Sequence, residues 1–171
     1  IELDRGGPSI EPLLLLADGR SLGWAQVQMQ HGLREDALPL PSVQWQHEAA
    51  GLRVEATADG PARAPRLLAR YTVSNPGPRP QRLSLLLLLR PWQVNPPQQF
   101  LSTPGGITAL RSLRWQDGRL RVQAGEGGAP AWQLRFSSTP QRITATGLDG
   151  GLGLASLRQG LALEPGLVFS D

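Results

Sequence analysis

The most constraining feature of this sequence is a run of five consecutive leucines, Leu85 to Leu89. The run shows no alternation of apolar and polar residues, so a β-strand formed here would bury both of its faces. A helix is the other structure that a short apolar run can form. However, the turn signals at Asn75-Pro76-Gly77-Pro78 and Pro91 leave only about a dozen residues between them, which favours a strand. We therefore predict a central strand with protein packed on each side.

Glycine and proline favour a fold of short strands joined by turns. The 171 residues include 20 glycines and 16 prolines, and this proportion disfavours long helices. A chain of this length can bury a core as one large domain or two small ones. Because it begins with Ile1 rather than methionine, we expect a single domain over residues 1–171, excised from a longer multidomain protein, so that a missing signal peptide carries little information.

The first Asp-Gly pair predicts a β-hairpin, because Asp-Gly favours the type I′ turn that joins antiparallel strands. The hairpin would join residues 13–17 to residues 20–31 through Asp18-Gly19. A two-residue turn at this point would place Leu15 opposite Leu22.

A second hairpin is predicted around Asp117-Gly118. A two-residue turn would place Trp115 opposite Leu120 and Leu113 opposite Val122. Both apolar pairs then fall on one side, so the turn and the alternation agree on the register.

Alternating segments separated by turn signals predict further strands. Leu38–Pro41 is expected to be an extended loop, because each proline biases the preceding residue to extended dihedral angles. Strands are predicted at residues 43–47, 52–57, 67–74, 132–136, 142–146 and 157–169. Four tryptophans lie on the apolar phase of these strands and are predicted to be in the core: Trp24, Trp45, Trp115 and Trp132. We predict an all-β fold, a large antiparallel β-sandwich (supersandwich) of ten or more short strands with little helix.

Composition argues against two classes of partner. All 17 basic residues are arginines, dispersed along the chain, and the net charge is only +3, whereas a nucleic-acid surface requires a basic patch or stripe. No apolar run approaches the roughly 20 residues that span a bilayer. We therefore expect no nucleic-acid partner and no membrane partner. The chain also has no cysteine, which excludes disulfides and thiolate chemistry.

Acidic residues and histidines do not form a recognisable catalytic or metal pattern. Glu35 and Asp36 are the only adjacent acids, and in an extended segment they point in opposite directions. His31 and His47 lie at strand ends without another ligand at metal-binding spacing. Four of the seven aspartates are followed directly by glycine, so turn formation explains them: Asp18, Asp59, Asp117 and Asp149. We predict no catalytic residue, no metal site and no cofactor in this chain.

A cluster of aromatic, amide and guanidinium side chains follows the leucine run. Aromatic rings stack on the C–H faces of sugars, and planar amide or guanidinium groups bond sugar hydroxyls. Several prolines stiffen the same segment, which lowers the entropic cost of holding a site. The alternative is that Trp92 and Phe100 cap the core while the amides bond the loop backbone. The candidate carbohydrate-binding residues are Arg90, Trp92, Gln93, Asn95, Gln98 and Gln99.

Residues 68–85, followed by Arg-Pro-Trp-Gln-Val-Asn-Pro-Pro at 90–97, resemble a known domain family. The resemblance is to the β-sandwich domain that precedes the (α/α)6 barrel in bacterial glycoside hydrolase- and phosphorylase-like proteins. That domain has the supersandwich architecture of galactose mutarotase-like proteins. Residues 17–20, 38–45 and 100–106 resemble further parts of the pattern, and the similarity spans roughly residues 13–123.

The resemblance implies a particular role for this domain. In such proteins the catalytic carboxylates usually lie in the helical barrel, and the sandwich packs against it. No catalytic residue is carried over, because a mutarotase-type histidine and glutamate pair has no convincing counterpart in this sequence.

We therefore expect a non-catalytic domain of a carbohydrate-active enzyme. It would brace the catalytic helical-barrel domain of the same polypeptide and contact an oligo- or polysaccharide. The alternatives are an independent carbohydrate-binding module, a mutarotase-like enzyme that uses His31 or His47 with a glutamate, and a purely structural or protein-interaction sandwich.

Overall fold

The computed structural model describes residues 1–4, 6–34, 38–94, 106–124, 131–145, 161–162 and 168–170. In these residues the chain forms thirteen β-strands and one short 3-10 helix, and the strand pairs with an established register are antiparallel. The prediction of an all-β antiparallel fold is confirmed. No helix in the described part of the chain is long and apolar enough to cross a membrane.

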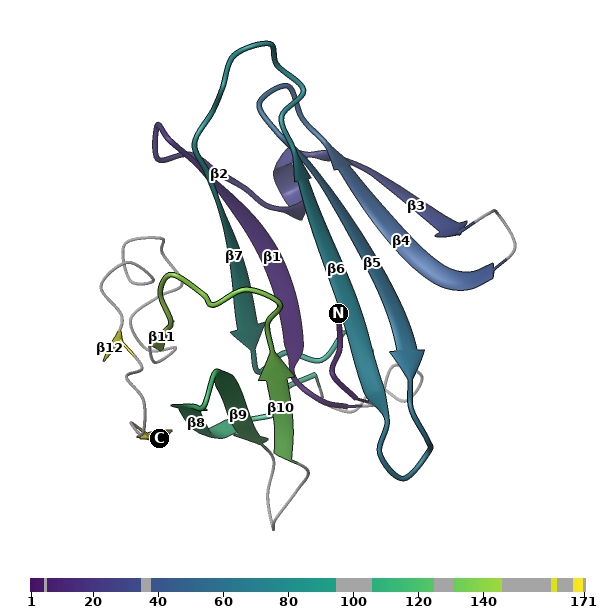
Figure 1. Ribbon diagram of the computed structural model, residues 1–171, viewed down its shortest axis with the longest axis vertical. Coiled ribbons are helices and arrows are strands. Elements are labelled where there is room, and N and C mark those ends of the chain that lie inside the picture. The colour runs from purple at the N-terminus through teal and green to yellow at the C-terminus, as the bar shows by residue number, and fades with distance from the viewer. Residues whose placement is uncertain are drawn as a thin grey trace. The chain divides into compact units, whose positions relative to one another are not determined.

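The chain divides into two compact units (Figure 1). The first comprises Ile1 and Ile10–Leu89, and the second comprises Glu2–Ser9 and Arg90–Asp171. Whether the two units act as the single predicted domain stays a prediction.

Two sheets form the first unit. One has the order β2-β1-β7 and the other the order β3-β4-β5-β6. Their strands are β1 (Ser9–Leu16), β2 (Ser21–Leu22), β3 (Gln28–Arg34), β4 (Leu38–Gln46), β5 (Gly51–Asp59), β6 (Arg66–Ser74) and β7 (Leu83–Arg90), and the helix η1 is Trp24–Gln26. One buried cluster holds the sheets together as a sandwich, and its buried members are Leu14, Leu16, Leu22, Trp45, Ala50, Leu52 and Val54.

The two faces of the four-stranded sheet differ in character because side chains alternate along each strand. One row across the sheet consists of Met29, Trp45, Leu52 and Val73. The middle two are 4% and 1% exposed, whereas Met29 and Val73 are 41% and 37% exposed. The core therefore covers the two central strands and leaves the apolar side chains of the outer strands accessible.

The leucine run forms strand β7, so the prediction of a strand is confirmed. Its position differs from the prediction, because β7 lies at the edge of its three-stranded sheet in the described part of the chain. Leu83 and Leu85 pack against the core cluster, and by alternation Leu86 and Leu88 belong to the opposite face. Every residue from Leu85 to Leu89 is half-buried rather than buried.

The first hairpin has a different register from the prediction. Leu14 pairs with Leu22 and Leu15 with Ser21, one residue away from the register of a two-residue turn. The Leu16 N–H donates to the Arg20 carbonyl at 2.9 Å, and Gly19 has a φ of 88°. This is the three-residue hairpin loop in which a type I turn is followed by a left-handed glycine.

The return strand predicted for residues 20–31 is interrupted. Strand β2 covers two residues, η1 follows it, and strand β3 begins at Gln28. Trp24 begins η1 and is 61% exposed, so its predicted place in the core is wrong. The alternation of apolar residues predicts the wrong direction for the Trp24 side chain, because η1 interrupts the strand and changes the direction of its side chains.

Leu38–Pro41, predicted to be a loop, belongs to strand β4. Strand β4 pairs with β3 up to Leu38, but its pairing with β5 covers only Ser42–Gln46. Proline has no backbone N–H to donate, so it fits in a strand at positions from which the neighbouring strand accepts no hydrogen bond. The prolines of β4 lie in the part where β5 does not pair.

The second unit contains the sheet β10-β9-β8-β13 and the pair β11-β12. Its strands are β8 (Leu110–Gln116), β9 (Arg119–Ala124), β10 (Ala131–Arg135), β11 (Thr144–Ala145), β12 (Leu161–Ala162) and β13 (Val168–Ser170). Trp115 pairs with Leu120 and Leu113 with Val122, as predicted. Positive φ values at Asp117 and Gly118, 53° and 68°, are those of the predicted type I′ turn. Every second residue of β9 is buried: Leu120, Val122 and Ala124.

The contrast between buried and exposed leucines on the first unit's larger sheet gives a test of the fold. We predict that Leu52→Ala lowers the free energy of unfolding by about 2–5 kcal/mol, because it opens a cavity in the core. Leu68→Ala, at a side chain that is 53% exposed on the same sheet, should change it by less than about 0.5 kcal/mol. Urea unfolding of the two variants measures both values, and equal losses would contradict this packing.

Candidate functional site

Three of the six predicted carbohydrate-binding residues lie in the described part of the chain. They are Arg90, at the end of β7, and Trp92 and Gln93, in the segment that follows it. Asn95, Gln98 and Gln99 lie outside the described residues. The structure thus shows half of the predicted cluster, and all of that half belongs to the second unit.

Backbone hydrogen bonds hold the segment after β7 in place. The Thr108 N–H donates to the Pro91 carbonyl at 2.6 Å, and the Gln93 N–H donates to the Gly106 carbonyl at 2.8 Å. An isolated bridge between Trp92 and Ile107 lies between these bonds. The Trp92 backbone is therefore fixed by a short antiparallel contact, although most of the intervening loop is outside the described residues.

Arg90 and Trp92 form a surface pair. The guanidinium carbon of Arg90 lies 4.7 Å from the centroid of the Trp92 ring, which is the geometry of a cation–π contact. Trp92 is 36% exposed. The guanidinium covers part of the ring, and Trp92 still presents a partly exposed aromatic surface.

Gln93 turns its amide nitrogen toward the protein. Its Nε2 donates to the Gly6 carbonyl at 3.0 Å and to the Thr108 Oγ1 at 2.7 Å, and the Thr108 hydroxyl also donates to the Gly6 carbonyl. The Gln93 Oε1 is buried and has no partner among the described residues. Gln93 thus ties the segment to the N-terminal residues, and its amide donors are already engaged.

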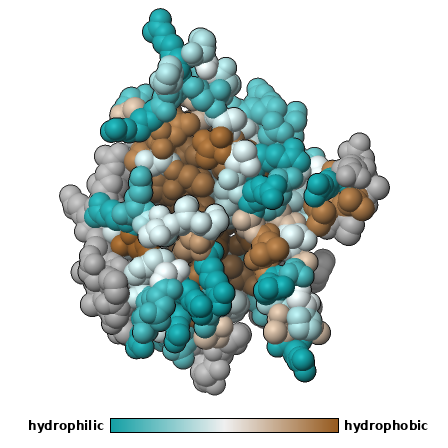
Figure 2. Space-filling view, viewed as in Figure 1, coloured by the Kyte–Doolittle hydropathy of each residue, from teal (hydrophilic) through white to brown (hydrophobic). Residues whose placement is uncertain are grey.

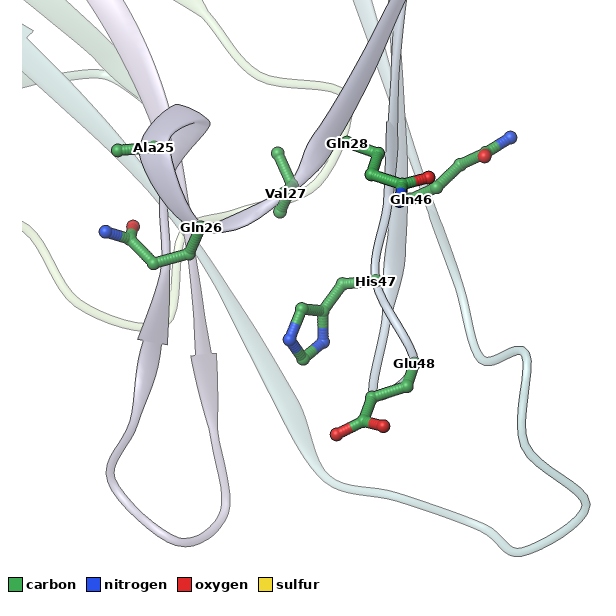
Figure 3. A pocket seen from close by; sticks show the side chains of 7 residues that line it. All are labelled: Ala25, Gln26, Val27, Gln28, Gln46, His47 and Glu48. Carbon is green, nitrogen blue, oxygen red and sulfur yellow. The ribbon is translucent and has the colours of Figure 1, made fainter.

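An open groove in the first unit is a second candidate site, which our sequence analysis missed. Its volume is about 760 Å³, and it lies between η1 and the turn after β4 (Figure 3). The residues that line it are Ala25, Gln26, Val27, Gln28, Gln46, His47 and Glu48. The available signal was the repetition of glutamine at every second position in the flanking segments, residues 26–30 and 44–46.

Hydrogen bonds fix two polar side chains of the groove. The His47 Nδ1 accepts a hydrogen bond from the Ala49 N–H at 3.1 Å, so in neutral imidazole the proton is on Nε2. The Gln26 Oε1 accepts from the Gly23 N–H at 3.0 Å. Figure 3 shows the His47 ring and the Glu48 carboxylate pointing into the opening, whereas the amides of Gln28 and Gln46 point away from it.

The outer face of the larger sheet begins at the rim of this groove, and it carries further amides. Gln28 is opposite Gln46, and Gln30 is opposite Gln44. Opposite residues in antiparallel strands share a face, so the four amides form a two-by-two block on β3 and β4. Three of them are exposed, and Gln44 is half-buried.

The acids of the described residues do not gather into a group that could hold a metal ion. No group of three or more potential metal ligands occurs in this part of the chain. Three exposed ion pairs engage Asp18 with Arg20, Glu55 with Arg53, and Asp59 with Arg66. Hydrogen bonds from the Arg20 backbone N–H and then its guanidinium lower the pKa of Asp18. These acids serve turns and surface pairs.

The two histidines lie in different places. His31 is on β3 opposite Val43, on the core-facing side of the larger sheet, whereas His47 and Glu48 line the groove. The mutarotase-like alternative therefore keeps one histidine and one glutamate in a common groove and excludes His31 from it.

Comparison with known proteins adds no assignment: no protein-family model matches the chain, and neither does any curated protein or solved structure.

The Tyr71 hydroxyl in the first unit has a raised pKa. It packs against the core cluster, and its hydroxyl is buried without a hydrogen-bond partner among the described residues. Burial raises the pKa of Tyr71 to about 12 from an ordinary value of 10.0, because the ionised phenolate would lose its hydration.

This raised pKa predicts a loss of stability at high pH. Between pH 10.0 and about 12 the unfolded chain has released the Tyr71 proton and the folded chain has not, so the free energy of unfolding falls as pH rises. Tyr71 is the only tyrosine, so phenolate absorbance reports its titration directly. Tyr71→Phe should remove this part of the decline, and a midpoint near pH 10 in the folded protein would contradict the burial.

Proposed function

We propose that this chain is a non-catalytic β-sandwich domain of a carbohydrate-active enzyme, with the supersandwich architecture of galactose mutarotase-like proteins. It braces the catalytic helical-barrel domain of the same polypeptide and contacts glycan through the segment that follows β7. The resemblance of residues 68–85 and 90–97 motivates this assignment. One structural observation carries the bracing role: the apolar side chains left accessible on the outer strands of the first unit's larger sheet.

These side chains lie on the core-facing side of the sheet, where a soluble surface would ordinarily be polar. On β3 they are Met29 and Leu33, which are 41% and 48% exposed, and on β6 they are Leu67 and Val73, which are 40% and 37% exposed. Figure 2 also shows hydrophobic surface over β1 and β7 and near the ends of β3 and β4. Accessible apolar groups of this kind favour contact with another protein domain.

The glycan contact is supported by the Arg90–Trp92 pair. The partly exposed indole of Trp92 provides a stacking surface for a sugar ring, and the Arg90 guanidinium packs against the same indole.

A mutarotase-like enzyme is the second candidate function. The observation that favours it is the common groove of His47 and Glu48, because a histidine and a carboxylate are able to act as acid and base. We favour the non-catalytic role, because the groove is open and Glu48 is exposed.

Met29 provides a direct test of the bracing contact, because it is the only methionine and lies on the accessible strip of β3. We predict that peroxide oxidises Met29 readily in the isolated chain and several-fold more slowly when the same polypeptide also carries the catalytic module, because the contact excludes the oxidant. Mass spectrometry measures the rate. The denatured chain gives the rate of full exposure, and Met29→Leu identifies the modified peptide.

Equal oxidation rates in the isolated and the longer polypeptide would overturn the bracing role of the β3 strip. A second measurement guards against an indirect effect. Leu33→Gln should weaken the association of the two modules, whereas Gln30→Ala, on the opposite face of the same strand, should leave it unchanged.

For the glycan contact, we predict that Trp92→Ala weakens binding of the tetrasaccharide that the chain binds, maltotetraose or cellotetraose, at least about tenfold. This loss corresponds to about 1.4 kcal/mol, and it follows because the substitution removes the stacking surface. Val94→Ala is the matched control, since Val94 is 57% exposed in the same segment. Calorimetric titration with maltotetraose and cellotetraose measures both variants. Unchanged affinity in Trp92→Ala would exclude this ring from the contact.

A further inference from the structure

The groove beside η1 combines a fixed hydrogen-bond donor with an acceptor. Because the Ala49 N–H occupies the Nδ1 of His47, its Nε2–H is the donor that points into the opening (Figure 3). Glu48 supplies carboxylate oxygens, which accept only. A donor next to an acceptor matches two neighbouring hydroxyl groups, each of which can donate and accept.

Apolar groups complete the lining. Ala25 and Val27 belong to the groove, and Val27 also packs against the buried core of the first unit, which holds that wall in position. Apolar carbon next to a donor–acceptor pair suits a ring that has one C–H face and several hydroxyls on its edge. The volume of about 760 Å³ lies within the range of small-molecule sites, roughly 300–1,000 Å³.

The block of four amides begins at the rim of this groove, where Gln28 and Gln46 point away from the opening, and runs along the outer face of the sheet. Gln28 and Gln46 line the groove, and Gln30 and Gln44 are the next residues on that face. Positions in the block are separated by roughly 5 Å across the strands and roughly 7 Å along them. This spacing places an amide within reach of each successive ring of an extended sugar chain.

We propose that the groove and the amide block together bind an extended neutral glycan. Its terminal ring lies in the groove against His47 and Glu48, and the following rings lie over the glutamines of β3 and β4. The ligand is neutral, because the residues that line the groove include no arginine and the carboxylate of Glu48 repels an anionic sugar. This inference rests on the proposed function, since it concerns the same class of ligand, but it places the glycan on the first unit.

Nuclear magnetic resonance titration of the whole chain tests the proposal. Maltotetraose and cellotetraose are the neutral probes, the corresponding disaccharides test length, and tetragalacturonate tests charge. We expect saturable shifts in the backbone amides of residues 25–30 and 44–48 with a neutral tetrasaccharide. Affinity should be lower for its disaccharide and for tetragalacturonate.

Variants separate the groove from the amide block. His47→Asp keeps an acceptor for the Ala49 N–H and supplies no donor to the groove, so it should weaken binding of both chain lengths about tenfold, equivalent to about 1.4 kcal/mol. Gln30→Ala should weaken binding of the tetrasaccharide and leave the disaccharide unchanged. Leu68→Ala, exposed on β6 of the same sheet, is the matched control and should bind normally.

Each other outcome has a defined meaning. Shifts confined to residues 92–94 would overturn this proposal and keep the glycan contact of the proposed function. Shifts confined to residues 25–30 and 44–48 would support the proposal and remove the role of Trp92. Equal affinities for both chain lengths would overturn the extended site. Without any saturable shift, both glycan sites are overturned, and the oxidation of Met29 alone decides the bracing role.

Discussion

The first unit depends on one packing relation, the burial of the central strands of a wide sheet by a narrower one. Trp45 and Leu52 are enclosed by Leu14, Leu16 and Leu22 from the opposing sheet. That sheet has three strands, and its strand β2 is only two residues long. Because the covering layer is the narrower, burial is deepest in the middle of β4 and β5, at Trp45, Leu52 and Val54, and shallower over β3 and β6. The accessible apolar strips follow from this difference in width.

The same sheet offers two chemically different surfaces, separated by the alternation of its side chains. On β3, Met29 and Leu33 belong to the core-facing side, and Gln28 and Gln30 belong to the outer side. A domain contact and a glycan contact are thereby able to use one sheet without competing for the same side chains. A slip of one residue in the β3–β4 register would exchange the two sets, so the pairing of Met29 with Trp45 matters for both roles.

Arg90, Trp92 and Gln93 show how one short segment divides its residues between structure and surface. The sequence placed all three in a single candidate cluster because aromatic and amide groups suit sugars. In the structure, Trp92 and Arg90 remain together at the surface, whereas Gln93 uses its amide to hold Gly6 and Thr108. Sequence spacing does not reveal this division, because Gly6 is distant in the chain and its carbonyl reaches Gln93 only after folding.

The hairpins show how far local sequence determined this protein. Alternation and turn chemistry specify the all-β class, the strand Leu83–Arg90 and the hairpin at Asp117-Gly118, because turn and strand pattern there demand one register. At Asp18-Gly19 the same dipeptide forms a three-residue loop, in which the Asp18 carboxylate bonds the Arg20 N–H and guanidinium. The sequence by itself therefore determined the all-β class, most of the strands and the second hairpin turn, which depend on neighbouring residues. Only the tertiary structure decided that β7 is an edge strand and that Trp24 is exposed. It also decided that His47 and Gln26 line the same groove. These properties depend on which sheet covers which, and that is set by contacts between residues far apart in the chain.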